Sequence, residues 1–226
     1  GLKEREKVAT AGNFLIDSQM QLAGKPSLID PRRAIAKQRE RKAPLEFQSP
    51  IVVPLAGEAG ERLESLYAAY FEIQKTLAAD RKPAMDATVT LSRTAGELAK
   101  DEAIEPEAKE KLAEIARASE HLHHMELAEA RQSFKPVSHA VVSLATRFRG
   151  EDSRQEFTHI FCPMVDGGGG DWLQSGGNLK FDAVRNPYKG SEMLTCGKQA
   201  HRLPTSGPVV SLLEKKPPAP AKKPGS

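Results

Sequence analysis

Leu63-Glu-Ser-Leu-Tyr-Ala-Ala-Tyr-Phe-Glu-Ile-Gln-Lys-Thr-Leu77 places an apolar residue at every third or fourth position. Residues spaced in this way lie on one stripe of an α-helix, because the helix completes a turn in about 3.6 residues. Three later segments have the same spacing, with the stripes Ala84, Thr88, Leu91, Ala95 and Leu98; Ala108, Leu112, Ile115, Ser119 and Leu122; and Leu127, Ala130, Phe134, Val137, Val141, Leu144 and Phe148. Four amphipathic helices with short links predict a mainly α protein, with an antiparallel four-helix bundle over residues 55–150.

Three prolines bear on these predicted helices. Pro83 and Pro106 suit the first turns of the second and third helices, where a missing N–H costs nothing. Pro136 falls inside the fourth helix, and its ring clashes with the preceding turn. We therefore expect the fourth helix to bend or split near Gln132.

The overall composition limits the class of protein. Hydrophobic residues make up 39% and aromatics only 5%, and the apolar residues are mostly Ala, Leu and Val, which favours helices. The net charge of +3, from 33 basic and 30 acidic residues, is too even to predict a nucleic-acid partner. No apolar run approaches the ~20 residues of a membrane span. Because residue 1 is Gly and no signal peptide is present, we expect a piece of a longer chain.

Segments outside the bundle differ in character. Residues 1–24 contain a short apolar run and a turn, and we interpret them as the end of a β domain. Residues 25–54 are rich in proline and carry a basic cluster; they are typical of a solvated linker, with a lipid or acidic partner as the alternative. Residues 201–226 end in a Pro-, Ala- and Lys-rich run that predicts a disordered tail.

The sulfur-bearing residues gather in one small region. Cys162 and Met164 lie two apart at a predicted strand end, so their side chains share a face. Met193 and Cys196 lie three apart in a predicted helical turn and also share a face. Thiolate and thioether ligands together select soft ions such as Cu(I). We expect residues 151–200 to form a small irregular subdomain with short strands, packed on the bundle, in which these four residues bind a soft metal ion.

A structural disulfide between Cys162 and Cys196 is the competing interpretation. The residues leave both interpretations open, because their spacing does not match the close cysteine pairs of common zinc sites. In the metal interpretation Trp172 and Tyr188 shield the site through sulfur–aromatic or cation–π contact. In the other, both aromatics simply pack the subdomain.

The histidines offer weaker candidates. His121 and His124 can share a face and form a second metal patch, although imidazoles also suit the end of a helix. We expect His139 to be exposed, and His159 to point away from Cys162 within a strand. The glycines at 167–170 predict a flexible loop, since no phosphate-binding motif follows them. With no nucleophile and base at recognisable spacing, we do not expect an enzyme.

Two stretches resemble known proteins. Residues 1–22, beginning Gly-Leu-Lys-Glu-Arg-Glu-Lys-Val, resemble the C-terminal end of a periplasmic adaptor (membrane-fusion protein) of a heavy-metal RND efflux pump, with Arg5 where that family usually has Gly. Four motifs within residues 55–200 are similar to a domain of unknown function found alone in exported proteins or appended to copper/silver efflux adaptors. They are Cys-Pro-Met at 162–164, Trp-Leu at 172–173, Asn-Pro-Tyr-Lys-Gly at 186–190 and Met-Leu-Thr-Cys-Gly at 193–197. The glycine run and residues 176–185 look like insertions relative to that family.

This resemblance implies a function and a location. It implies a periplasmic accessory domain that handles Cu(I) or Ag(I), passing the ion to the pump or sensing it. Its partners would be the RND pump, outer-membrane channel components and other adaptor copies, with inner-membrane association only through the full-length protein. The alternative is an interaction module without metal, stapled by a Cys162–Cys196 disulfide.

Overall fold

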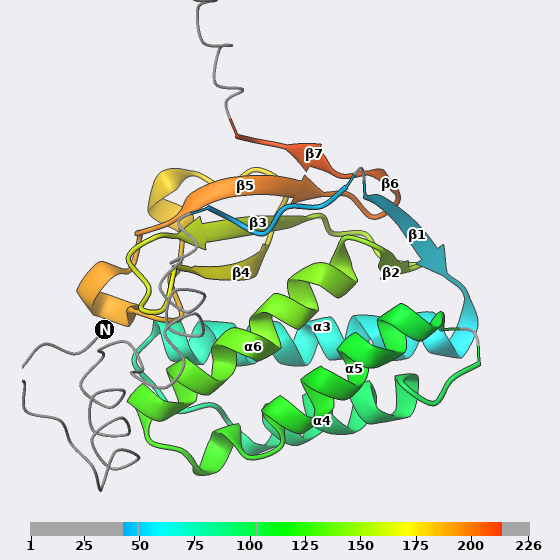
Figure 1. Ribbon diagram of the computed structural model, residues 1–226, viewed down its shortest axis with the longest axis horizontal. Coiled ribbons are helices and arrows are strands. Elements are labelled where there is room, and N and C mark those ends of the chain that lie inside the picture. Colours follow the sequence, from blue (N-terminus) through cyan, green and yellow to red (C-terminus); the bar gives the residue numbers. More distant parts are fainter. Residues whose placement is uncertain (1–42, 49, 103, 214–226) are drawn as a thin grey trace, which may run out of the picture. The chain divides into compact units, whose positions relative to one another are not determined.

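The computed structural model describes residues 43–48, 50–102 and 104–213, all within the second of the chain's two units, residues 42–226. The predicted β remnant at residues 1–24 and most of the predicted linker lie outside the described residues. The described part combines α-helices with two β-sheets (Figure 1). Its α-helices are α3 (Gly57–Ala78), α4 (Met85–Leu98), α5 (Pro106–Ser119) and α6 (Leu127–Ala145).

All four predicted helices are present, and their apolar stripes form one core. Leu63, Leu66, Tyr70, Ile73 and Leu77 of α3 are at most 1% exposed. Most stripe residues of α4, α5 and α6 are also buried, whereas Ala84 is exposed and Leu127 is only partly buried. Each helix packs against the next along the chain. The last predicted stripe residue, Phe148, instead begins a strand.

The prolines behave differently from one another. Pro106 is the first residue of α5, as predicted. Pro83 precedes Ala84, the N-cap of α4, so it lies outside that helix. Helix α6 continues through Pro136 from Leu127 to Ala145, so of the two predicted outcomes, a bend or a split, the split does not occur.

The strands overturn the predicted fold class. They are β1 (Ile51–Leu55), β2 (Phe148–Gly150), β3 (Phe157–Cys162), β4 (Gly170–Ser175), β5 (Lys198–Leu203), β6 (Gly207–Pro208) and β7 (Val210–Ser211). They form a three-stranded sheet in the order β2-β1-β6 and a four-stranded sheet in the order β4-β3-β5-β7. The described part is therefore a mixed α/β structure, and the prediction of a mainly α bundle with an irregular subdomain is wrong.

The physical reason is long-range pairing between short strands. Strand β1, which we placed mostly in the linker, pairs in parallel with β2 at the end of the bundle, with Val53 opposite Phe148. It also pairs with β6, which lies in the tail that we expected to be disordered from residue 201. In that tail β7 adds to β5, so residues 201–213 are largely in strands, while residues 214–226 lie outside the description.

A buried arginine joins the helices to the strands. Arg149, in β2, has no exposed side-chain surface, and its Nε donates to Oε1 of Glu64 in α3 at 3.0 Å. Its guanidinium carbon lies 3.6 Å from the centre of the Phe157 ring in β3. That ring in turn packs edge-on against Tyr67 and Phe71 of α3. The four-stranded sheet is thus fixed against α3 and, through β4, against α6 (Figure 1).

Candidate functional site

The two cysteines meet at one end of the four-stranded sheet. Cys162 is the last residue of β3, is fully buried, and lies opposite Gly170 of β4. Cys196 is partly exposed and follows the short 3₁₀ helix η3 (Gly190–Met193). Both are free cysteines, and their Sγ atoms lie 2.7 Å apart. The structure therefore brings together the two thiols predicted to share a site.

The predicted methionine ligands lie in the adjoining turns. Met164 comes two residues after Cys162 and is 56% exposed. Met193 is partly buried, and its carbonyl accepts a hydrogen bond from the Cys196 N–H at 2.9 Å, which closes the predicted turn. The contact that defines the site is thus the one between the thiols, with a methionine in the loop beside each.

The two predicted shielding aromatics form part of the core beneath the thiol turn. Trp172 is fully buried, and its ring packs edge-on against Tyr188 with 6.0 Å between ring centres. A Cβ on Gly197, the neighbour of Cys196, would lie 2.6 Å from both Cη2 of Trp172 and Cγ2 of Ile160. The backbone beside Cys196 therefore rests directly on the indole, and only glycine fits there.

An ion pair fastens the thiol-bearing loop to the helices. Asp80, just after α3, accepts hydrogen bonds from Nη2 of Arg131 at 2.5 Å and from the N–H of Ser191 at 3.0 Å. Arg131 also donates to the carbonyls of Leu77 and Pro187. Gly190 lies so close to both charged groups that a Cβ would overlap them. The hydrogen bonds from Ser191 and Arg131 lower the pKa of Asp80 to about 2.

The surroundings of Cys196 favour its protonated form. Burial raises the pKa of Cys196 to about 11, and the hydrogen bond and charge interaction with Cys162 act in the same direction. The Lys189 ammonium opposes this rise. Any ligand that needs thiolates must therefore displace protons from this site.

The predicted histidine patch follows the end of the third helix. Helix α5 ends at Ser119. His121 directly precedes the short 3₁₀ helix η1 (Leu122–His124), and His124 is its last residue, with 6.3 Å between the two ring centres. Within residues 43–48, 50–102 and 104–213, no group of three or more His, Cys, Asp or Glu side chains is arranged to hold a metal ion.

Sequence reasoning missed a buried histidine–aspartate network. His159 and Asp171 have no exposed side-chain surface, and Nε2 of His159 lies 2.7 Å from Oδ1 of Asp171. Nδ1 of His159 lies 2.9 Å from Nδ1 of His201 across the β3–β5 pair. His139, expected to be exposed, has a side chain only 25% exposed, with Nε2 3.5 Å from Oδ2 of Asp171. No local pattern marked Asp171, because its partners come from other strands and from α6.

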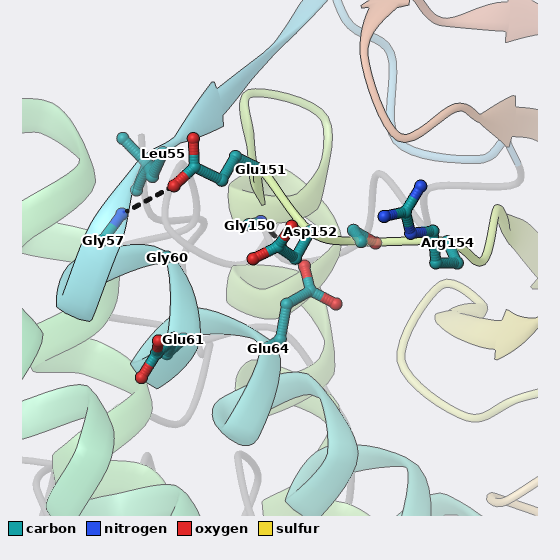
Figure 2. Close-up of a pocket in the computed structure, with 10 residues that line it drawn as sticks. Leu55, Gly57, Gly60, Glu61, Glu64, Gly150, Glu151, Asp152 and Arg154 are labelled. Atoms are coloured by element: carbon teal, nitrogen blue, oxygen red, sulfur yellow. Dashed lines mark hydrogen bonds between the residues drawn. The ribbon is translucent and has the colours of Figure 1, made fainter.

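A separate cavity of about 410 Å³ lies at the start of α3, away from the thiols. Figure 2 shows the carboxylates of Glu61, Glu64, Glu151 and Asp152 around it. Glu64 is occupied by Arg149 and by the N–H of Gly150, and Glu151 accepts from the N–H of Gly57 at 3.0 Å. Glu64 and Glu151 therefore stabilise the junction between α3 and β2.

Comparison with models of protein families, with curated proteins and with solved structures found no match. No α-helix in the described ranges has the length and apolar character needed to cross a membrane.

Proposed function

We propose that this chain is an accessory domain of a heavy-metal efflux adaptor that binds Cu(I) or Ag(I) as cargo at Cys162 and Cys196. The observation that carries the proposal is the contact between a fully buried thiol and a partly exposed one, 2.7 Å apart. Sulfur ligands select soft monovalent ions over the harder ions that prefer oxygen. A partly exposed Cys196 suits an ion that must be taken up and passed on.

The fit of an ion to this pair requires a small movement. With metal–sulfur bonds of about 2.3 Å, two sulfurs on opposite sides of one ion lie about 4.6 Å apart. Cys162 is held by the sheet, whereas Cys196 lies in a turn at the surface. Rotation of the Cys196 side chain toward solvent would widen the distance between the two sulfurs to this value. It would also turn the Cys196 sulfur toward the solvent, from which an ion arrives. Along the chain, Met193 lies three residues before Cys196 in the same turn, and Met164 lies two residues after Cys162.

The proposal extends to location and partners. The resemblance of residues 55–200 to a domain appended to copper/silver efflux adaptors supports a periplasmic chain. Its partners would be the RND pump, the outer-membrane channel components and other adaptor copies. The domain would pass the ion to the pump or sense it, without a catalytic step.

The separation between the two Sγ atoms also favours a second candidate function. At 2.7 Å the sulfurs need to approach by well under 1 Å to form a disulfide. A disulfide would join the end of β3 to the loop of residues 176–197 and make the domain a metal-free interaction module. The two functions differ in the redox state of the cysteines.

The experiment that tests the proposal is an anaerobic titration of the reduced protein with Cu(I) against a competing chelator, after a thiol count on the protein as purified. Uptake of one Cu(I) per chain, abolished by Cys162→Ser and weakened by Met193→Leu, is the expected result. Met85→Leu is the matched control, because Met85 is an exposed methionine on α4. A reduced protein that binds no Cu(I) would refute the proposal, and a large loss of stability on reduction would establish the second candidate.

A further inference from the structure

A single buried amide, Asn186, organises the turn that carries Cys196. The residue has no exposed surface. Its side-chain Oδ1 accepts hydrogen bonds from the backbone N–H groups of Tyr188 at 2.9 Å and Lys189 at 3.2 Å. Its Nδ2 donates to the carbonyl of Cys196 at 2.8 Å. The amide thus joins the start of the loop to the cysteine itself.

The backbone of Asn186 adds two further connections. Its N–H donates to the carbonyl of Leu194 at 2.8 Å, and its carbonyl accepts from the N–H of Gly190 at 3.1 Å. One residue therefore holds both ends of the 190–196 turn. A carboxamide suits the side-chain part, because its oxygen accepts two hydrogen bonds while its NH₂ group donates one.

We propose that Asn186 is a positioning residue that sets Cys196 opposite Cys162; the inference rests on the proposed function of the thiol pair. Cys162 is fixed by the β3–β4 ladder, so the separation of the sulfurs depends on the turn. The hydrogen bond to the Cys196 carbonyl restrains the backbone while leaving the side chain free to rotate. It raises the effective concentration of one thiol near the other.

Asn186→Asp removes this hydrogen bond. The carboxylate still accepts from Tyr188 and Lys189 but no longer donates to Cys196. Gln74→Glu is the matched control, because Gln74 is 1% exposed and its Nε2 donates to the carbonyl of Arg185 at 2.7 Å. Both changes replace a buried amide donor that reaches the same loop with an acid, but only Asn186 contacts Cys196. Asn186→Ser is an uncharged second variant, whose short hydroxyl can support the turn but does not reach Cys196.

The first readout is thiol–disulfide exchange with glutathione. One oxidised glutathione accepts two electrons from the protein dithiol, giving the Cys162–Cys196 disulfide and two molecules of reduced glutathione. We expect Asn186→Asp to lower the equilibrium constant for disulfide formation about tenfold, the scale of one buried hydrogen bond. Protonation of the new carboxyl restores a hydrogen-bond donor to the Cys196 carbonyl. The difference between the equilibrium constants of the variant and the wild type should therefore shrink as the pH falls. Gln74→Glu should leave the equilibrium unchanged.

The second readout is Cu(I) affinity by chelator competition, which we expect to fall in Asn186→Asp and Asn186→Ser but not in Gln74→Glu. Circular dichroism shows which variants are folded, and Asn186→Ser replaces Asn186→Asp if the acid does not fold. Equal exchange constants for Asn186→Ser, Gln74→Glu and wild type would overturn the positioning role. If the wild-type protein takes up no Cu(I), the proposed function fails, while the glutathione equilibrium still decides the role of Asn186.

Discussion

Nε2 of His159 lies 2.7 Å from Oδ1 of Asp171, and neither side chain has any exposed surface. The carboxylate accepts, so Nε2 of His159 carries its hydrogen, and in neutral rings Nδ1 accepts from Nδ1–H of His201. The N–H of Leu45 donates to the same carboxylate oxygen at 3.0 Å. The ring of Phe47 packs edge-on against both imidazoles. The network therefore joins β3, β4 and β5 to the segment before β1.

The first prediction is that acid destabilises the fold through His201. Burial, and then the nearby His159, lower the pKa of His201 from 6.5 to about 4, with Asp171 acting in the opposite direction. Between these values the unfolded chain binds a proton that the folded chain does not, so stability falls as the pH drops from about 6.5 to 4. Urea denaturation across this range measures the loss.

His201→Gln provides the control for this prediction. It removes the titrating group next to His159 while keeping a polar side chain at the β5 position. The stability of this variant should fall less steeply over the same pH range. An unchanged slope would assign the pH dependence to a group other than His201.

The second prediction concerns the acidic member of the network. Asp171→Asn removes the charge that accepts from His159 and Leu45, and we expect a loss of about 2 kcal/mol in the free energy of unfolding. Asp166→Asn is the matched control, because its carboxylate lies five residues away and is 98% exposed. Equal stabilities for the two variants, measured by chemical denaturation, would contradict a structural role for the buried carboxylate.

The helices could be predicted from sequence because their signal is local. The stripe from Leu63 to Leu77 lies within one helix and faces one core. The sheets could not be predicted in this way, because the paired strands are far apart in the sequence and most of them are short. Val53 pairs with Phe148 across the whole bundle, and β6 and β7 contain two residues each.

In the candidate site, too, the local features could be predicted from sequence and the long-range contacts could not. Alternation along a strand correctly separates Cys162 from His159, and the chemistry of sulfur singles out Cys162 and Cys196. The partner of His159 could not be predicted, because Asp171 follows a glycine loop whose return path sequence does not specify. The role of Asn186 was also missed, since its hydrogen bonds join backbone groups two to ten residues away.

The third prediction contrasts two glycines. Gly197→Ala places a Cβ 2.6 Å from Trp172 and Ile160, and we expect this overpacking beside Cys196 to cost about 2 kcal/mol. Gly96→Ala in α4 meets only Ala116 Cβ, at 3.9 Å, and should stabilise the protein by about 0.5–1 kcal/mol. The two variants should therefore shift the denaturation midpoint in opposite directions. A shift in the same direction would show that the turn beside Trp172 adapts to the added methyl group.

The fourth prediction is that Cu(I) affinity rises continuously with pH. Because burial, with the hydrogen bond and charge of Cys162 adding to it, raises the pKa of Cys196 to about 11, this thiol stays protonated at neutral pH and must lose its proton to bind the ion. Loss of the Cys196 proton should raise the affinity by about tenfold per pH unit across the neutral range. Competition titrations corrected for protonation of the chelator measure this slope. Cys196→Ser should remove this contribution to the slope, and a slope near zero in the wild-type protein would show that Cys196 does not bind the ion as a thiolate.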